Sequence, residues 1–158
     1  MADKPNPLPA GSQAPDFTAE TFDGQQVSLS GLLAEGKMVA LYFYPKDATP
    51  GCTKQACNLR DNLGQLNDHG IAVIGVSPDD DASHERFSSK QELNFPLIAD
   101  PDHSVIDQYG VWGEKSNYGK TYMGLQRTTF LIDTDATIKH VFKRPKVADH
   151  TAEIISKL

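Results

Sequence analysis

Residues 38–76 read MVALYFYPKDATPGCTKQACNLRDNLGQLNDHGIAVIGV, with two apolar runs on either side of a helical pattern. The first run, 38–44, is short for a helix and stops at Pro45, so it predicts a strand buried on both faces. The second run, 71–76, predicts another such strand. Between them we expect one helix over 53–68, because apolar residues recur there at spacings of three and four: Ala56, Leu59, Leu63 and Leu66. These elements form a βαβ unit with parallel strands and a right-handed crossover.

The rest of the chain predicts a mixed α/β fold. Residues 1–15 contain four prolines and predict an extended N-terminal arm, and residues 17–29 predict a β-hairpin around an Asp-Gly turn. Downstream, the patterns predict a helix over 80–93 with Ser77 as its N-cap, a strand at 97–99, a helix at 103–109, a loop at 110–124, a hairpin of 127–133 with 137–142, and a closing helix at 147–158.

This order of elements predicts an α/β fold of the thioredoxin type, with a central mixed β-sheet flanked by helices and an N-terminal β-hairpin extension. The length of 158 residues, with 39% hydrophobic and 23% charged residues, is typical of one globular domain, which we expect to span 1–158. A formal net charge of −6 argues against nucleic acid as a partner. No segment approaches the ~20 apolar residues of a membrane span, and residues 1–11 lack a signal-peptide core. We therefore expect a cytoplasmic location.

The chain has only two cysteines, which excludes a disulfide-rich scaffold. Cys52 follows the first central strand and lies where the next helix should begin, at the edge of the sheet where α/β proteins usually bind ligands. The free N–H groups of a first helical turn favour a thiolate, which is the reactive form of cysteine. The alternative is a small buried core residue, but Gly51 and Thr53 indicate a turn, where core residues are uncommon.

Cys57 follows five residues later. On an ideal helix, positions i and i+5 have Cα atoms about 8.6 Å apart and side chains about 140° apart. A disulfide usually needs Cα atoms within about 7 Å, so a Cys52–Cys57 bridge requires local unwinding. The alternative is packing beside Ala56. Zinc is disfavoured because no second ligand pair lies nearby, and we interpret the five scattered histidines as surface residues: His69, His84, His103, His140 and His150.

Several segments resemble a known family. The sequence of 45–53, PKDATPGCT, resembles the peroxiredoxin active-site pattern Pro-x-x-x-Thr-x-x-Cys. The KQAC that follows at 54–57 is similar to the bacterioferritin comigratory protein (PrxQ) subgroup. The resemblance continues through GVSPD at 75–79, YGVWGEK at 109–115 and RTTFLID at 127–133, and so covers nearly the whole chain.

The resemblance implies a thiol-dependent peroxidase that reduces hydrogen peroxide and organic hydroperoxides. Cys52 would be the peroxidatic cysteine and would become a sulfenic acid, which Cys57 would resolve by forming an intramolecular disulfide. A thioredoxin or glutaredoxin-like dithiol would restore both thiols. The resemblance implies no metal, haem, flavin or other cofactor, and a monomer.

Three further residues are assigned to the site by the resemblance. Thr49 would accept a hydrogen bond from the peroxide and donate one to the thiolate. Arg127 would stabilise the thiolate and the charge of the transition state, and Pro45 would shield the thiolate side of the pocket. Members of the subgroup often have Glu where this chain has Gln55, whose amide can still bind an arginine.

Two other functions stay open at this point. A thiol–disulfide oxidoreductase would turn over disulfides far faster than peroxides. A non-catalytic redox sensor or holdase would be oxidised stoichiometrically and would form a stable complex with its partner.

A group of aromatic residues precedes Arg127 and is open to two interpretations. The residues either line an apolar patch for longer alkyl peroxides or are simply packed in the core. They are Tyr109, Trp112, Tyr118 and Tyr122.

Overall fold

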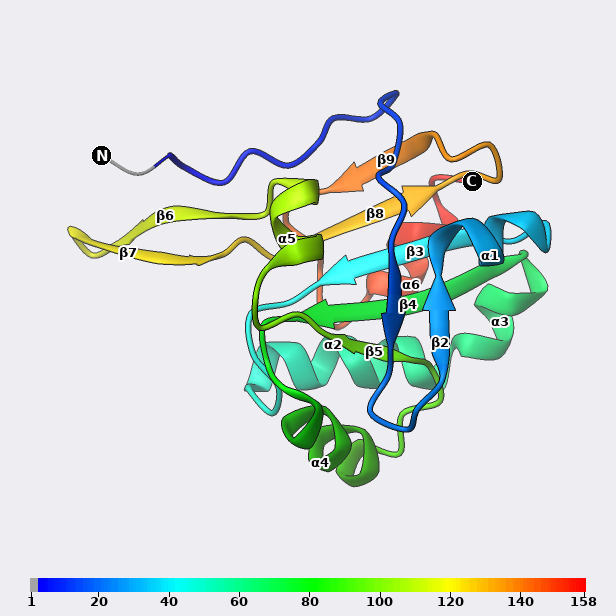
Figure 1. The fold of residues 1–158 in the computed structure, drawn as a ribbon, viewed down its shortest axis with the longest axis horizontal. Coiled ribbons are helices and arrows are strands. Elements are labelled where there is room, and N and C mark those ends of the chain that lie inside the picture. The colour runs from blue at the N-terminus through cyan, green and yellow to red at the C-terminus, as the bar shows by residue number, and fades with distance from the viewer. Residues whose placement is uncertain (1–2) are drawn as a thin grey trace.

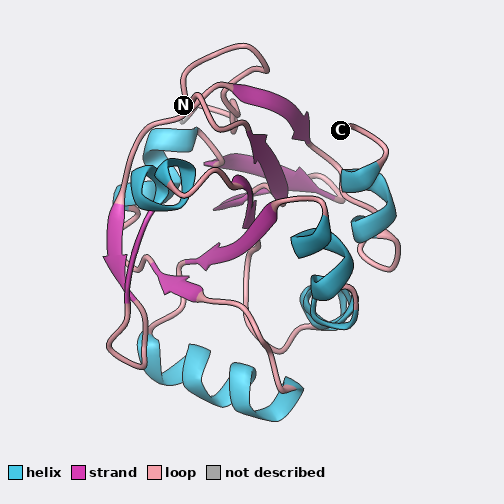
Figure 2. Ribbon diagram, turned by 90° about the vertical axis from the view of Figure 1, so that its right-hand side faces the viewer, coloured by secondary structure: helices cyan, strands magenta, loops and turns pink. Residues whose placement is uncertain are grey.

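The computed structural model describes residues 3–158 and contains a central five-stranded sheet with helices packed on both faces (Figures 1 and 2). The strand order is β5-β4-β3-β8-β9, in which the first three strands are parallel and the last two are antiparallel to their neighbours. This confirms the predicted mixed sheet. The strands are β3 (Met38–Phe43), β4 (Ile71–Ser77), β5 (Leu97–Ala99), β8 (Thr128–Ile132) and β9 (Ile138–Phe142).

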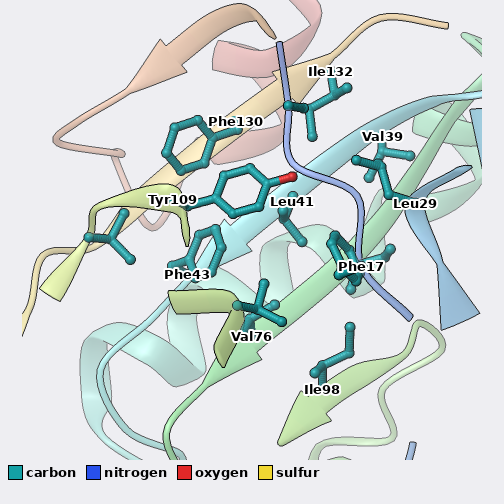
Figure 3. Close-up of a cluster of buried hydrophobic side chains, with 14 of the residues drawn as sticks. Phe17, Leu29, Val39, Leu41, Phe43, Val76, Ile98, Tyr109, Phe130 and Ile132 are labelled. Carbon is teal, nitrogen blue, oxygen red and sulfur yellow. The ribbon is translucent and has the colours of Figure 1, made fainter. Parts of the chain in front are cut away.

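Side chains of β3 alternate between two hydrophobic clusters, which explains why its sequence is apolar throughout. Val39, Leu41 and Phe43 belong to the cluster shown in Figure 3. That cluster also contains residues of two short helices, α1 (Leu29–Ala34) and α5 (Ser104–Tyr109). The first of these helices was not predicted from the sequence; its N-cap is Ser28, whose hydroxyl accepts a hydrogen bond from Gly31 N at 3.0 Å.

The opposite face of β3 carries Ala40 and Tyr42, which belong to the second cluster. Cys52 is part of the same cluster, so the candidate nucleophile packs directly against the apolar core. The helices that supply this cluster are α2 (Pro50–Asp61), α3 (Leu63–Asp68), α4 (Asp81–Gln91) and α6 (His150–Ile155).

The single helix predicted over 53–68 is wrong, because α2 and α3 are separate helices that meet at Asn62. The side chain of Asn62 donates a hydrogen bond to the carbonyl of Asn58 at 2.8 Å, a local bond by which asparagine competes with regular helix. The start of α2 is also earlier than predicted. Pro50 suits the first helical position, where the N–H that proline lacks has no intrahelical partner.

Ser77 is not a helix N-cap as predicted. It is the last residue of β4, pairs with Ala99 and accepts a hydrogen bond from Asp100 N, which keep it in the sheet. The N-cap of α4 is Asp80, whose carboxylate accepts a hydrogen bond from Ser83 N at 2.8 Å.

Residues 110–124 do not form the predicted loop. They contain β6 (Trp112–Asn117) and β7 (Lys120–Leu125), an antiparallel hairpin that extends away from the sheet (Figure 1). The two residues of its turn, Tyr118 and Gly119, both have positive φ, as a tight hairpin turn requires. The strands were missed because their side chains are mostly polar and exposed.

The N-terminal hairpin was predicted correctly and consists of β1 (Thr18–Glu20) and β2 (Gln26–Ser28). Before it, the chain crosses the domain surface with few regular elements. Its backbone bonds to Gly110 through Asn6 and to Ile138 through Gly11. The first two residues of the predicted arm lie outside the described residues.

The longest helix, α2, has 12 residues. Within residues 3–158, no helix has the length and apolar character that crossing a membrane requires.

Gly75, in β4, provides a test of how this strand packs beside β3 and β5. A Cβ atom there would lie 2.8 Å from Leu97 Cδ2 and 2.9 Å from the Tyr42 ring, and both side chains are buried. We expect Gly75→Ala to lower the free energy of unfolding by about 1–3 kcal/mol in urea titrations. Gly64→Ala in α3 is the control, because a Cβ there meets no heavy atom within 4 Å and should stabilise by about 0.5–1 kcal/mol. Equal stability of Gly75→Ala and wild type would contradict this packing.

Candidate active site

Cys52 is the third residue of α2, which begins beyond the carboxyl end of β3. Thr49 is the N-cap residue, and its carbonyl accepts the first intrahelical hydrogen bond from Thr53 N at 2.8 Å. Cys52 is only 1% exposed. Its thiol therefore lies at the positive end of a helix and in a place from which bulk water is largely excluded.

Arg127 directly contacts this thiol. It precedes β8, and because Thr128 pairs with Phe43 at the end of β3, Arg127 lies beside the start of α2. Its Nη2 donates a hydrogen bond to Cys52 Sγ at 3.1 Å, and its Nη1 donates one to Gln55 Oε1 at 2.6 Å. The guanidinium thus binds two residues of one helical turn and brings a fixed positive charge to the sulfur.

Two buried polar atoms near the thiol have no hydrogen-bond partner among residues 3–158: Gln55 Nε2 and the Tyr42 hydroxyl. Buried polar groups are usually paired, and exceptions often belong to functional sites. Burial, together with the nearby Cys52 and Asp47, raises the pKa of Tyr42 well above its usual value. Tyr42 is therefore a neutral hydrogen-bond donor at physiological pH.

The loop between β3 and α2 contains the other two predicted site residues. Pro45 is exposed at its start, and Thr49 is half-buried at its end. The Thr49 hydroxyl donates its hydrogen bond to the Lys46 carbonyl at 2.9 Å. The expected donation from Thr49 to the thiolate is therefore absent, because the single hydroxyl proton is already committed within the turn.

Cys57 lies in the same helix as Cys52, and both cysteines are free thiols. Its Sγ lies 3.5 Å from Gln91 Oε1 in α4, and the residue is half-buried. Because α2 is continuous through Cys52 and Cys57, the two residues have the separation expected for positions i and i+5 of an ideal helix. A disulfide between them requires the intervening turns to unwind.

The two halves of α2 are bound to the rest of the protein very differently. Beyond Cys57, the Asn58 side chain donates to Ala148 O at 2.9 Å and accepts from Thr151 N at 2.8 Å. Arg60 donates to Gln91 O at 2.6 Å. Around Cys52, the side-chain bonds to other elements are those of Arg127. Unwinding should therefore begin at the Cys52 end.

Sequence reasoning missed a buried ion pair below the active-site loop. We predicted His84 as a surface residue, but it is fully buried. Its Nδ1 lies 2.7 Å from Asp47 Oδ2 and its Nε2 lies 3.0 Å from Ile98 O. Both partners are acceptors, so both ring nitrogens must donate and the ring is an imidazolium. The sequence contained one indication that His84 is buried. It lies three residues before the core residue Phe87, on the same helix face.

Asp47 connects the active-site loop to three other side chains. Its carboxylate accepts hydrogen bonds from the Tyr44 hydroxyl at 2.6 Å and from Ser83 Oγ at 2.8 Å, and its backbone N–H donates to Asp79 Oδ2 at 2.8 Å. Burial favours the neutral carboxyl, but the bonds from His84 and Tyr44 outweigh it and lower the pKa of Asp47. The loop is thereby fixed to β3 and α4.

The pKa of His84 is shifted in the opposite direction to that of Asp47. Burial alone would lower its pKa, but the hydrogen bond and charge of Asp47 outweigh this effect and raise the pKa of His84. Both shifts favour the ionised forms of the pair.

His150 is a second histidine that the surface prediction misplaced. It is fully buried, with Nε2 2.8 Å from the Thr129 hydroxyl and Nδ1 3.0 Å from Glu153 Oε1. A neutral ring satisfies both contacts by accepting from the threonine and donating to the carboxylate. Burial is the main cause that lowers the pKa of His150, and the charge of Arg127 acts in the same direction.

The aromatic residues before Arg127 do not form one cluster. Tyr109 is buried between Phe43 and Phe130, whereas Tyr118 is 97% exposed at the tip of the β6–β7 hairpin.

Metal ligands are a separate question. In the part of the chain that the structure describes, no group of three His, Cys, Asp or Glu residues is placed to bind a metal ion.

The two buried histidines predict opposite pH dependences of stability. His84 has a raised folded pKa, so its stabilisation is complete below the unfolded value of about 6.5 and is lost as pH rises through the folded value. His150 has a lowered folded pKa, so its stabilisation is lost as pH falls below about 6.5. We expect the free energy of unfolding to peak near that pH in urea titrations.

Single variants separate the two contributions. His84→Gln should remove the decline on the alkaline side, and His150→Gln should remove a decline on the acidic side. An alkaline slope that persists in His84→Gln would mean that the ring is not an imidazolium in the folded protein.

Comparison with known proteins places this geometry in a family. The model of the AhpC/TSA family matches residues 10–141. The chain is 49% identical over 153 residues to peroxiredoxin Bcp of Escherichia coli K12, and 50% identical over 153 residues to a Haemophilus influenzae protein described as a putative peroxiredoxin bcp. In both comparisons the match covers 97% of each chain.

Solved structures of similar fold agree with this family assignment. Peroxidoxin BcpB from Mycobacterium tuberculosis superposes with a TM-score of 0.83 at 31% identity, covering 95% of this chain and 96% of that one. The bacterioferritin comigratory protein of Xanthomonas campestris, solved to understand its alkyl peroxide reduction activity, gives a TM-score of 0.81 at 33% identity over 89% of each chain. Both neighbours support the thioredoxin-like fold, and the chain belongs to the AhpC/TSA family as a peroxiredoxin of the Bcp/PrxQ type.

Proposed function

We propose that this peroxiredoxin reduces hydrogen peroxide and organic hydroperoxides with Cys52 as the peroxidatic residue. The observation that carries the proposal is the 3.1 Å hydrogen bond from Arg127 to a buried thiol in the first turn of α2. A helix N-terminus and a guanidinium both favour the thiolate, and both can stabilise negative charge that develops during the reaction. Reactive cysteines characteristically lie at helix N-termini or beside Lys and Arg, whereas structural buried cysteines are inert.

In the first step, the Cys52 thiolate attacks the terminal oxygen of the hydroperoxide. The S–O bond forms as the O–O bond breaks, so sulfur loses two electrons and the peroxide gains them. The products are a sulfenic acid and an alkoxide, or hydroxide from hydrogen peroxide, which takes up a proton and leaves as an alcohol or water. Arg127 is positioned to stabilise the oxygen that gains charge.

Thr49 and Pro45 are assigned to the same step. With its proton donated to Lys46 O, the Thr49 hydroxyl retains lone pairs that can accept a hydrogen bond from the peroxide O–H. This would orient the terminal oxygen toward sulfur. Pro45 limits the conformations of the loop at its start and shields that side of the thiolate.

Cys57 resolves the sulfenic acid in the second step. Its thiol sulfur displaces the sulfenic oxygen as water and forms the Cys52–Cys57 disulfide. The Cys52 end of α2 must unwind for this, and the bonds of Asn58 and Arg60 support the other end. Movement would thus be confined to the first turns of the helix.

An external dithiol of the thioredoxin or glutaredoxin type completes the cycle by exchange with this disulfide, which regenerates both thiols and oxidises the dithiol. We propose a cytoplasmic reaction, where such dithiols are kept reduced. A disulfide within one chain needs no partner subunit, so we propose a monomer. We also propose that residues 1–158 act as one domain, because the N-terminal segment bonds to the backbone near α5 and β9.

Cysteine variants test the cycle. In a peroxidase assay coupled to a thioredoxin system, Cys52→Ser should be inactive because it lacks the nucleophile. Cys57→Ser should react once with peroxide and then stall as a sulfenic acid or a higher oxide. By intact mass, oxidised wild type should be lighter by about 2 Da, as a disulfide is.

The rival functions give different results in this assay. Turnover of peroxide by Cys52→Ser would contradict the assignment of the nucleophile. Faster turnover of disulfides than of peroxides would indicate a thiol–disulfide oxidoreductase, and stoichiometric oxidation without turnover would indicate a redox sensor.

Substitution of Arg127 should produce a graded loss of activity. Arg127→Gln removes the charge and should lower kcat/KM for hydrogen peroxide by about 10²–10³-fold. Arg127→Lys keeps the charge but cannot bind Cys52 and Gln55 with one planar group, so its loss should be smaller. Arg86→Lys, at an exposed position of α4, is the control and should match wild type. Equal rates for Arg127→Gln and wild type would exclude the proposed role.

A further inference from the structure

Beside the candidate active site lies an open cleft of about 450 Å³. Three segments form its walls: the base of the β6–β7 hairpin, the residues just before β8 and the residues just after β9. Its lining consists of Lys115, Gln126, Arg127, Lys143, Arg144 and Pro145.

The cleft is cationic in a protein whose net charge is −6. All four ionisable residues of its lining are Lys or Arg, and within residues 3–158 none of them forms an ion pair with a carboxylate. Lys115 Nζ donates to Leu125 O at 3.2 Å, which fixes one ammonium at the base of the hairpin. Lys143 and Arg144 are exposed and available to a ligand.

Arg127 belongs to both the cleft and the reacting centre. It lines the cleft, and its Nη2 donates to Cys52 Sγ. Cys52 itself is almost inaccessible, so a substrate must approach through groups that surround it. Arg127 thus joins the sulfur to the cleft, and a substrate that reaches the sulfur beside this side chain has the cleft next to it.

We propose that this cleft binds the anionic group of a hydroperoxide substrate, such as a carboxylate, while its peroxide group reacts at Cys52. The proposal rests on the proposed function and specifies the substrates that it favours. Arg144 can bind a carboxylate through two parallel hydrogen bonds, and Lys143 and Lys115 add positive charge. Arg127 remains bonded to the sulfur. Hydrogen peroxide lacks a group that could use this cleft.

The redox chemistry is unchanged by this interaction. The thiolate takes the terminal oxygen, the O–O bond breaks, and the remaining alkoxide takes up a proton. The product is an alcohol that still carries the carboxylate. The cleft thus contributes to capture of the substrate, by raising its local concentration before the bond-breaking step.

A matched pair of substrates tests the proposal in the wild-type protein. Cumene hydroperoxide with a para-carboxylate and the methyl ester of the same compound differ in charge but share the reacting group. At low ionic strength we expect kcat/KM to be about tenfold higher for the acid. Added salt should reduce this preference, because it screens exposed charges, and should leave the ester rate nearly constant.

Charge reversal locates the effect in the cleft. The double variant Lys143→Glu/Arg144→Glu should lower the acid-to-ester ratio of kcat/KM by about tenfold or more. Single charge reversals in and out of the cleft form the matched pair. Lys143→Glu, just after β9, should lower the ratio, whereas Lys139→Glu, exposed within β9 but outside the lining, should not.

Three results would contradict the proposal, and they are distinguishable. Equal kcat/KM for acid and ester, with normal turnover of both, would exclude anion binding in the cleft and leave the peroxidase function intact. Failure of the wild-type protein to turn over either substrate or hydrogen peroxide would instead refute the proposed function. An unchanged ratio in a folded double variant would assign the preference to another surface.

Discussion

The two hydrogen bonds of Arg127 are the interaction on which the site depends. They join α2 to β8, two elements that lie next to each other only because β8 pairs with β3 and α2 follows it. The burial of Cys52 then has a chemical consequence. A buried charge needs a partner, and the guanidinium is the charged group that directly contacts the sulfur. Gly51 contributes to this fit, because a Cβ at that position would lie 3.3 Å from the guanidinium.

In the proposed cycle, α2 must be stable enough to hold Cys52 beside Arg127, and its first turns must also be able to unwind. Its first turns contain the reactive cysteine and are bound to other elements through Arg127, whereas its later turns are bound through Asn58 and Arg60 to α6 and α4. Oxidation of Cys52 would change the group that Arg127 binds, and so would act on the part of the helix with the fewest other side-chain hydrogen bonds. Under the proposed resolution by Cys57, the offset of five residues requires a local conformational change rather than a movement of the whole domain.

The sequence predicted the sheet, and the placement of Cys52 in the fold, where each depended on local patterns. The continuous apolar run of β3, the hairpin of β8 and β9, and the position of Cys52 at a helix start were all readable because burial on two faces and turn residues leave strong signals. The break at Asn62 and the β6–β7 hairpin could not be predicted in this way. A side-chain hydrogen bond and exposed polar strands leave only weak signals in the sequence. His84 and His150 were misplaced for a different reason. Histidine is common on protein surfaces, and each of these two is buried because it has two hydrogen-bond partners. His84 bonds to Asp47 and Ile98, and His150 bonds to Thr129 and Glu153. These partners come together only in the folded protein.

The ion pair of Asp47 and His84 also bears on the electrostatics of the thiol. Burial raises the pKa of Tyr42, and the charges of Cys52 and Asp47 act in the same direction. An uncompensated carboxylate in that position would oppose a second negative charge on sulfur. Because His84 is an imidazolium, the pair is neutral overall, and Asp47 can fix the active-site loop without repelling the thiolate. Arg127 adds positive charge beside Cys52 Sγ, and it also lines the cationic cleft. Positive charge is therefore concentrated next to this thiol in a protein whose net charge is −6.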